Sequence, residues 1–266
     1  MSIRNYTPRR RRHGISGRSK LFLGGSLVIT ILLQMSYPLV HGSLLQFVTI
    51  ASVLTGASAM ALHALLSYGS KYLLRYLSIT YLFGFFIELI GVHTTWPFGE
   101  YTYDSSLGLA LFGVPLLVPC AWVMMVHPAL VAARRMTTKW TFLYGAAILA
   151  TWDLFLDPQM VSAGRWTWVV DGSHIPFAPD VPLSNFFGWL LAGIAIISLL
   201  NLVLPFERRK ESAKLAAVTG LLAWVLFSGL IGNLFFFNRP GLALLGAGAF
   251  GAVAIPFIFK STLGES

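Results

Sequence analysis

The chain has 266 residues, of which 56% are hydrophobic and only 11% charged, and its mean hydropathy is +0.72. A soluble protein of this size needs more charge to solvate its surface, so the composition excludes an ordinary soluble domain. Apolar runs of about 20 residues recur along the chain and match the thickness of a bilayer. We expect an all-α, polytopic integral membrane bundle, formed by one domain over residues 21–260.

Positive charge is concentrated at the N-terminus and in short connections between the apolar runs. The net charge is +9, and residues 1–20 are rich in Arg and Lys. We expect them to form a disordered basic tail at an anionic cytoplasmic membrane surface. The next apolar run is too long for the core of a signal peptide, which favours an uncleaved anchor. Because basic residues in short loops orient membrane helices, they do not indicate a nucleic-acid partner.

About eight membrane-spanning helices are predicted. They cover residues 21–40, 44–67, 72–95, 108–133, 140–157, 185–204, 214–236 and 241–260. With both termini in the cytoplasm, only Arg165 and Arg239 of the 19 basic residues fall in outer loops, which agrees with the positive-inside rule. We therefore expect a multi-pass protein of the cell inner (plasma) membrane, in contact with lipid. Its oligomeric state cannot be predicted from the sequence.

Three carboxyl groups lie inside the expected spans, where ionisable residues are costly and usually functional. Glu88 lies seven residues before Thr95, hence roughly 10 Å inside the outer end of the third span. Asp153 and Asp157 share one face of the fifth span. All three fall in the outer half of the membrane. Structural roles stay open: a buried Glu can bond a neighbouring helix, and Asp157 is expected to end its helix before Pro158.

Two long outer connections, at residues 96–107 and 158–184, contain Trp, Pro and Gly. Long loops on one face of a protein usually have a function, and we expect the first to fold as a polar lid over Glu88. Within the second, Trp166 and Trp168 are expected in the aromatic belt at the membrane interface.

The sequence indicates no metal and no cofactor. The six histidines show no metal-binding spacing, the single cysteine Cys120 excludes an intramolecular disulfide and a thiolate cluster, and no nucleotide-binding fingerprint occurs. Asp153-Leu-Phe-Leu-Asp157 matches the DxxxD motif of Mg²⁺–diphosphate prenyltransferases, but no second aspartate-rich motif accompanies it. No lysine lies in the middle of a span, which disfavours a retinal protein.

Four blocks occur in order: GVHTTWPFGEYTYDSSLG, GVPLLVPCAWVMM, DPQMVSAGRWTW and VPLSNFFGW. Their order resembles the membrane carotenoid biosynthesis proteins of the CruF type, the carotenoid 1,2-hydratases, also described as bisanhydrobacterioruberin hydratases. The blocks cover roughly Glu88 to Trp189, over a third of the chain. Two features differ from the family pattern. Thr95 stands where the pattern has glycine, and the segment DGSHIPFAPDVPLSNF lacks a tyrosine-rich run.

The resemblance implies a cofactor-independent hydro-lyase that adds water to the terminal C1–C2 double bond of an acyclic (ψ) carotenoid end, such as that of lycopene. A buried neutral carboxylic acid would protonate the alkene, aromatic faces would stabilise the tertiary cation, and water would capture it. In this hypothesis Asp153 or Glu88 donates the proton, while Asp157 and Asn185 position the water. The expected substrate contacts are Trp96, Phe98, Tyr101, Tyr103, Trp152, Asn185 and Trp189.

Two other functions stay open. A lycopene cyclase would use the same protonation, but an intramolecular alkene would capture the cation and the mass would not change. A small-molecule transporter or channel would use Glu88 as a proton relay. It would need a continuous polar path through both halves of the membrane, and the inner half offers little of this.

Overall fold

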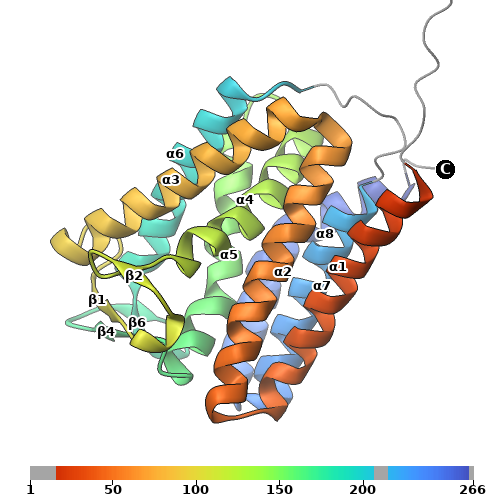
Figure 1. Ribbon diagram of the computed structural model, residues 1–266. Helices are drawn as coiled ribbons and strands as arrows, with labels where there is room; N and C mark the ends of the chain where they lie inside the picture. Colours follow the sequence, from red (N-terminus) through yellow and green to blue (C-terminus); the bar gives the residue numbers. More distant parts are fainter. Residues whose placement is uncertain (1–15, 207–214, 264–266) are drawn as a thin grey trace, which may run out of the picture.

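The computed structural model describes residues 16–206 and 215–263. Within these residues, eight α-helices form a bundle and three two-stranded ribbons lie at one end of it, referred to below as the strand end (Figure 1). The helices are α1 (Gly17–Ser36), α2 (Gly42–Tyr68), α3 (Ser70–Thr94), α4 (Leu117–Met136), α5 (Thr141–Ser162), α6 (Leu183–Val203), α7 (Ala216–Ile231) and α8 (Pro240–Leu263).

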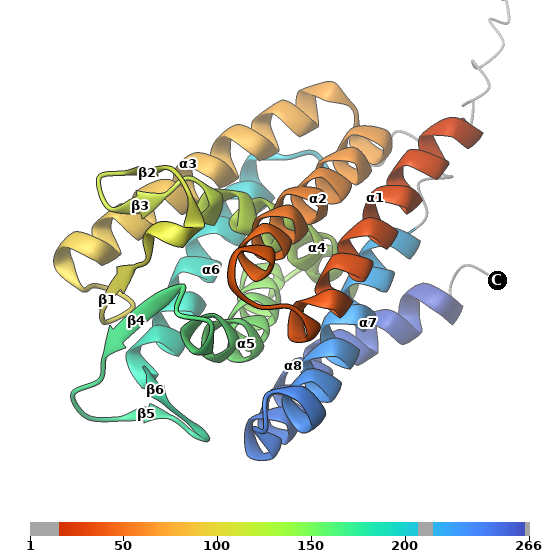
Figure 2. The same ribbon diagram turned by 60° about the horizontal axis from the view of Figure 1, so that its bottom comes forward.

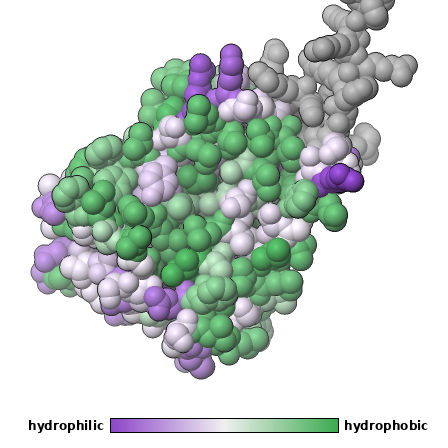
Figure 3. Space-filling view, in the orientation of Figure 1, coloured by the Kyte–Doolittle hydropathy of each residue, from purple (hydrophilic) through white to green (hydrophobic). Residues whose placement is uncertain are grey.

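The described helices support the prediction of a polytopic membrane protein. Seven of them are long and apolar enough to cross a membrane; α5, which carries two aspartates, is not among these seven. Hydrophobic residues cover most of the face shown in Figure 3, and hydrophilic residues gather near its edges. In water this surface would be unfavourable, whereas lipid solvates it. The chain is therefore an all-α multi-pass membrane protein.

Two helices begin more than two residues away from the predicted starts. Helix α1 begins at Gly17, where the side chain of Ser16 accepts a hydrogen bond from the Ser19 amide; residues 1–15 of the expected tail lie outside the described residues. Helix α4 begins at Leu117 rather than at residue 108, because Gly108 and Gly113 have positive φ angles of 89° and 83°. A right-handed helix cannot contain such residues. This segment instead forms the hairpin of β2 (Ala110–Leu111) and β3 (Val114–Pro115).

The expectation that α5 would end at Asp157 was wrong, because the helix continues through Pro158 to Ser162. A proline removes one backbone donor, but the surrounding protein can offset this in a membrane helix. Further hydrogen bonds fix this end of the helix, because the Pro158 carbonyl accepts from the Ser162 hydroxyl at 2.8 Å and from Arg239 at 3.1 Å. Asp157 and Pro158 are also buried, so this last turn is held by its surroundings.

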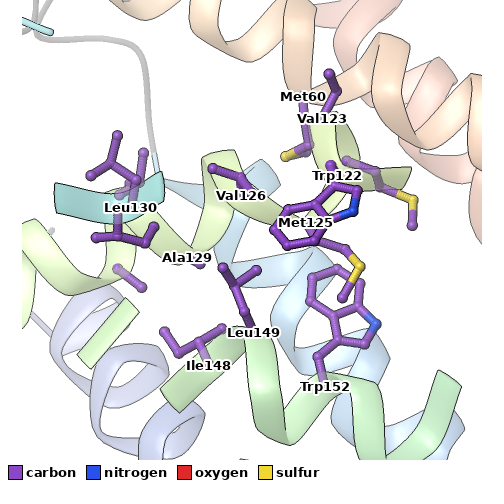
Figure 4. Packing of buried hydrophobic residues seen from close by; sticks show 14 of the residues in the cluster. Met60, Trp122, Val123, Met125, Val126, Ala129, Leu130, Ile148, Leu149 and Trp152 are labelled. Atoms are coloured by element: carbon purple, nitrogen blue, oxygen red, sulfur yellow. The ribbon is translucent and has the colours of Figure 1, made fainter. Parts of the chain in front are cut away.

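Helix α4 is the centre of the bundle. Every residue from Trp122 to Ala133 is buried, and α4 packs against α2, α3, α5, α6, α7 and α8. Figure 4 shows Met125 and Ala129 of α4 packed toward Ile148 and Leu149 of α5. Figure 2 shows α3 and α6 on one side of this centre and α1, α7 and α8 on the other. A hydrophobic core of this extent holds the strand end in a defined position.

The two long outer connections pair with each other. Strand β1 (Glu100–Tyr103) from the first lies antiparallel to β4 (Trp166–Val169) from the second, with Tyr101 opposite Trp168 and Tyr103 opposite Trp166. The second connection also contains the ribbon of β5 (His174–Ile175) and β6 (Ala178–Pro182). Because successive side chains of a strand point to opposite faces, the tyrosines and tryptophans share one face of the β1–β4 ribbon.

Thr95 ends α3 in the left-handed conformation, with a φ angle of 63°. This conformation is unfavourable for a β-branched side chain and carries no such penalty for glycine. Thr95 is the residue that stands in place of the glycine of the family pattern. The backbone therefore explains why a glycine suits this position.

We expect Thr95→Gly to raise the free energy of unfolding by about 1 kcal/mol, because it removes the penalty of the left-handed conformation. Thermal unfolding of the purified protein in detergent measures the change. The control is Thr94→Gly in the last helical turn, which should lower stability, since it weakens the helix and removes the Thr94 hydroxyl bond to the Ile90 carbonyl. A lower unfolding temperature for Thr95→Gly would contradict the expectation.

Candidate functional site

A cavity of about 70 Å³ lies under the β1–β4 ribbon. Its wall is built by α2, α3, α4, α5, α6 and the two strands, so it joins segments that are far apart in the sequence. Eighteen residues line it: Thr49, Val53, Glu88, Phe98, Tyr101, Tyr103, Leu107, Leu117, Val118, Ala121, Trp122, Leu156, Asp157, Met160, Trp166, Trp168, Asn185 and Trp189.

Glu88 of α3 is 4% exposed and accepts three hydrogen bonds. The hydroxyl groups of Tyr101 and Tyr103 donate to its Oε2 atom at 2.6 and 2.7 Å, and the indole N–H of Trp122 donates to Oε1 at 3.1 Å. Burial and the neighbouring Glu88 carboxyl raise the pKa of Tyr101 and of Tyr103 above the usual range, so both hydroxyls keep the proton that they donate. Three donors directed at one carboxyl group suit its ionised form, which can only accept.

Glycines allow β1 and the residues just before it to lie directly against α3 and α6. A Cβ atom on Gly91 of α3 would lie 2.5 Å from the Tyr101 hydroxyl oxygen, and one on Gly188 of α6 would lie 2.8 Å from the Pro97 carbonyl oxygen. The Ser184 hydroxyl also donates to the Phe98 carbonyl at 2.9 Å. The tyrosines thus reach Glu88 because the backbone can approach both helices closely.

A second acidic centre joins α5 to α6. The side-chain amide of Asn185 donates to Asp153 Oδ2 at 2.9 Å and also to Asp157 Oδ2. All three side chains are buried, but only Asp157 and Asn185 line the cavity. Two buried carboxyl groups on one amide repel each other when both are ionised, and a proton shared between them removes this repulsion. This centre can therefore hold a proton next to the cavity.

Aromatic rings make up most of the remaining wall. The rings of Trp122 and Trp189 are stacked, with centroids 4.6 Å apart and an interplanar angle of 13°. The ring centroids of Tyr101 and Trp168 are 4.6 Å apart, and those of Phe98 and Trp189 are 6.1 Å apart. The faces of such rings attract cations, most strongly where water is excluded. The cavity thus combines acidic groups with a surface that can stabilise positive charge.

Three polar groups of the wall are buried and have no hydrogen-bond partner within the described part of the chain. They are the indole N–H groups of Trp166 and Trp168 and the side-chain carbonyl of Asn185. Buried polar groups without a protein partner are normally satisfied by water or by a ligand. Two donors and one acceptor on one wall are suited to binding a water molecule beside Asp157.

The cavity contains most of the side chains that were predicted for the site. Asp153 lies behind it, bonded to Asn185. Trp152 lines a different cavity, and Trp96 is 56% exposed and lines neither. The predicted residues that do line it are Glu88, Phe98, Tyr101, Tyr103, Asp157, Asn185 and Trp189.

Three aromatic residues of the wall, Trp122, Trp166 and Trp168, were not among the predicted site residues. For the last two the sequence favoured the interfacial aromatic belt, but they line the cavity. Their spacing in Trp166-Thr-Trp168 repeats that of Tyr101-Thr-Tyr103, and this alternation is the signal that could have indicated two paired strands. Within the described residues, no three His, Cys, Asp or Glu side chains are grouped so that they could hold a metal ion.

We expect Tyr103→Phe to lower the free energy of unfolding by about 1–3 kcal/mol, because the buried Glu88 carboxyl loses one donor. Thermal unfolding in detergent measures the effect. Thr102→Val, on the opposite and exposed face of the same strand, should change stability by about 0.5 kcal/mol or less. Equal effects of the two substitutions would contradict this role of Tyr103.

Comparisons with known proteins agree on one family. A family model described as "Carotenoid biosynthesis protein" matches residues 48–253. The chain is also 36% identical over 181 residues to the bisanhydrobacterioruberin hydratase of Haloarcula japonica; the match covers 63% of this chain and 59% of that relative. No solved structure matches the chain. Since the family model covers well over half of the sequence, this chain belongs to the carotenoid biosynthesis protein family.

Proposed function

We propose that this protein is a carotenoid hydratase, which adds water to the terminal C1–C2 double bond of an acyclic carotenoid end group. The observation that carries the proposal is the composition of the cavity. Glu88, Asp157 and Asn185 line it together with aromatic rings, and three polar groups of the wall have no partner among the described residues. Such a cavity can bind a hydrocarbon end and a water molecule next to a proton donor of its own wall. The 36% identical relative, named as a hydratase, supports the same reaction class.

Asp157 is the proton donor in this proposal, rather than Asp153 or Glu88. Asp157 lines the cavity and shares the Asn185 amide with Asp153, so the pair can keep one proton beside the substrate. Glu88 already accepts three hydrogen bonds, which suits a carboxylate rather than an acid. Asp153 does not line the cavity, and we assign it to positioning Asn185 and to sharing the proton.

The reaction begins when the Asp157 carboxyl proton passes to the C2 carbon of the substrate. The alkene electron pair forms the new C–H bond, and C1 becomes a tertiary cation. The stacked Trp122 and Trp189 rings and the Glu88 carboxylate stabilise this charge, because electrostatic interactions are strong where water is excluded. Aromatic rings also exclude bulk water, so a single bound water can act as the nucleophile.

Addition of that water completes the reaction. The side-chain carbonyl of Asn185 accepts a hydrogen bond from the water, and the indole N–H of Trp166 donates one to it, which orients the oxygen toward C1. As the C1–O bond forms, the water gives one proton to the Asp157 carboxylate. The product is a tertiary alcohol, and Asp157 has regained the proton that it donated. The proposed reaction involves no change of oxidation state, and its protons balance without a cofactor.

The membrane location follows from the same hypothesis. A carotenoid is dissolved in the bilayer, so an enzyme for it gains from a site at membrane depth. We propose that the protein lies in the cell inner (plasma) membrane with both termini in the cytoplasm. In this orientation the strand end faces outward. Lipid contacts the exposed apolar side chains of the bundle, such as Leu74 and Phe86 of α3.

Expression in a lycopene-accumulating host tests the proposal, because a hydrated product is heavier by one water. We expect Asp157→Asn to lower conversion by about a hundredfold or more, as for loss of a general acid. Asp153→Asn should lower it less. The control is Asp180→Asn, which should keep the activity, because the Asp180 side chain is 61% exposed and does not line the cavity.

Three results would argue against the proposal. Unchanged pigment with folded wild-type protein would exclude hydration of lycopene. A product of unchanged mass with rings would indicate a cyclase instead. Full activity in Asp157→Asn, at a normal protein level, would show that another group donates the proton, and Glu88→Gln would then be the next variant to assay.

A further inference from the structure

A second and larger cavity, of about 270 Å³, adjoins the first. It lies among α1, α2, α4, α5 and α7 and the π-helical turn η3 (Gly232–Phe236) that follows α7. The two cavities share four wall residues, Thr49 and Val53 of α2 and Leu156 and Met160 of α5. These four residues, referred to below as the neck, belong to both walls, so the two cavities are adjacent.

The wall of the second cavity is suited to a hydrocarbon, although several polar residues belong to it. The Oε1 atom of Gln34 accepts the indole N–H of Trp224 at 2.6 Å, and the Asn233 amide donates to the Gly229 carbonyl at 2.8 Å. These two polar groups are bonded within the wall and need no polar ligand. The buried Tyr37 hydroxyl of the same wall has no hydrogen-bond partner within the described residues. The large apolar and aromatic residues of the wall are Met124, Trp152, Phe155, Trp224, Phe227, Phe236 and Phe237.

The shape of α7 near this cavity departs from a regular helix. Gly229 lets the helix approach α5, since a Cβ atom there would lie 2.7 Å from the Phe155 ring. The π-helical turn then carries Asn233 and Phe236 into the wall. Such turns are uncommon and occur frequently at functional sites. The local backbone therefore forms part of the cavity.

The volumes of the two cavities indicate which part of one ligand each of them can hold. Pockets that enclose a ligand of drug size have volumes of roughly 300–1,000 Å³. The first cavity, at about 70 Å³, can hold an end group and a water but not a long polyene. The second cavity adds about 270 Å³ directly behind the neck, and the two together slightly exceed the lower limit of that range.

We infer that the second cavity binds the part of the polyene chain that adjoins the reacting end, which lies in the first cavity. The residues Thr49, Val53, Leu156 and Met160 then surround the chain where it passes between α2 and α5. This inference rests on the proposed function for the identity of the ligand. It assigns the selection of long, linear substrates to residues of the second cavity and the neck rather than to the acidic groups themselves.

Binding and turnover test this inference separately. Ser228 lines only the second cavity, and we expect Ser228→Phe to weaken lycopene binding to the detergent-purified protein at least tenfold. The same substitution should lower the ratio of kcat/KM for lycopene to that for a short acyclic isoprenoid with the same terminal double bond at least tenfold. Val53→Phe, in the neck, should also weaken lycopene binding. Bound pigment is measured by absorbance after free pigment is removed.

Two substitutions of the same kind serve as controls. Leu54→Phe changes a residue of α2 that is 46% exposed and lines neither cavity, and Ala216→Phe changes an exposed residue of α7. Both should bind lycopene as the wild type does. Normal lycopene binding in both Ser228→Phe and Val53→Phe would overturn the inference. So would an equal loss of activity on the long and the short substrate in Ser228→Phe.

The outcome also separates this inference from the proposed function. Wild-type protein that binds lycopene without hydrating it, and loses that binding on Ser228→Phe, would contradict the hydratase and support the polyene cavity. Hydration of lycopene that Ser228→Phe and Val53→Phe leave unchanged would support the hydratase and overturn the polyene cavity.

Discussion

The structure of the site depends on one buried carboxyl group, that of Glu88. Burial of a charge is costly unless hydrogen bonds replace the lost water. Tyr101, Tyr103 and Trp122 supply three such bonds, and they come from a strand and from the central helix α4. None of these donors can move without leaving the carboxyl group short of a partner. Glu88 therefore holds α3, the β1–β4 ribbon and α4 in one relative position.

That constraint creates two acidic centres with different surroundings in one cavity. Glu88 is saturated with donors, whereas Asp153 and Asp157 share the single amide of Asn185. Different surroundings favour different protonation states, and a pair of this kind allows one group to act as an acid while the other stays charged. The aromatic rings between the centres exclude water, which strengthens both effects.

Much of the fold and the acidic residues of the site could be predicted from the sequence, because a bilayer requires long apolar helices and disfavours buried charges. The number and order of the helices follow from the length of the apolar runs, and the costs of burial single out Glu88, Asp153 and Asp157. The failures were local. Gly108 and Gly113 turn the start of the expected fourth span into a hairpin, and buried contacts carry α5 past Pro158. Apolar composition alone does not distinguish these cases.

The aromatic side chains were harder to assign, for a different physical reason. A tryptophan near a membrane surface serves equally well in an interfacial belt or in a cavity wall. Only the pairing of β1 with β4 decides between these roles, and that pairing joins two loops more than sixty residues apart in the chain. Trp96, which was expected in the site, is 56% exposed, whereas Phe98 two residues later is buried in the cavity wall.

The alternation of side chains along β1 makes the site sensitive to the length of its backbone. Tyr101 and Tyr103 face Glu88, while Glu100 and Thr102 face away. Loss of one residue from this strand would reverse the two faces and bring Glu100, a second acid, toward the first. Substitutions can therefore accumulate on the outer face of the ribbon during evolution, whereas insertions and deletions of a single residue should be excluded from it.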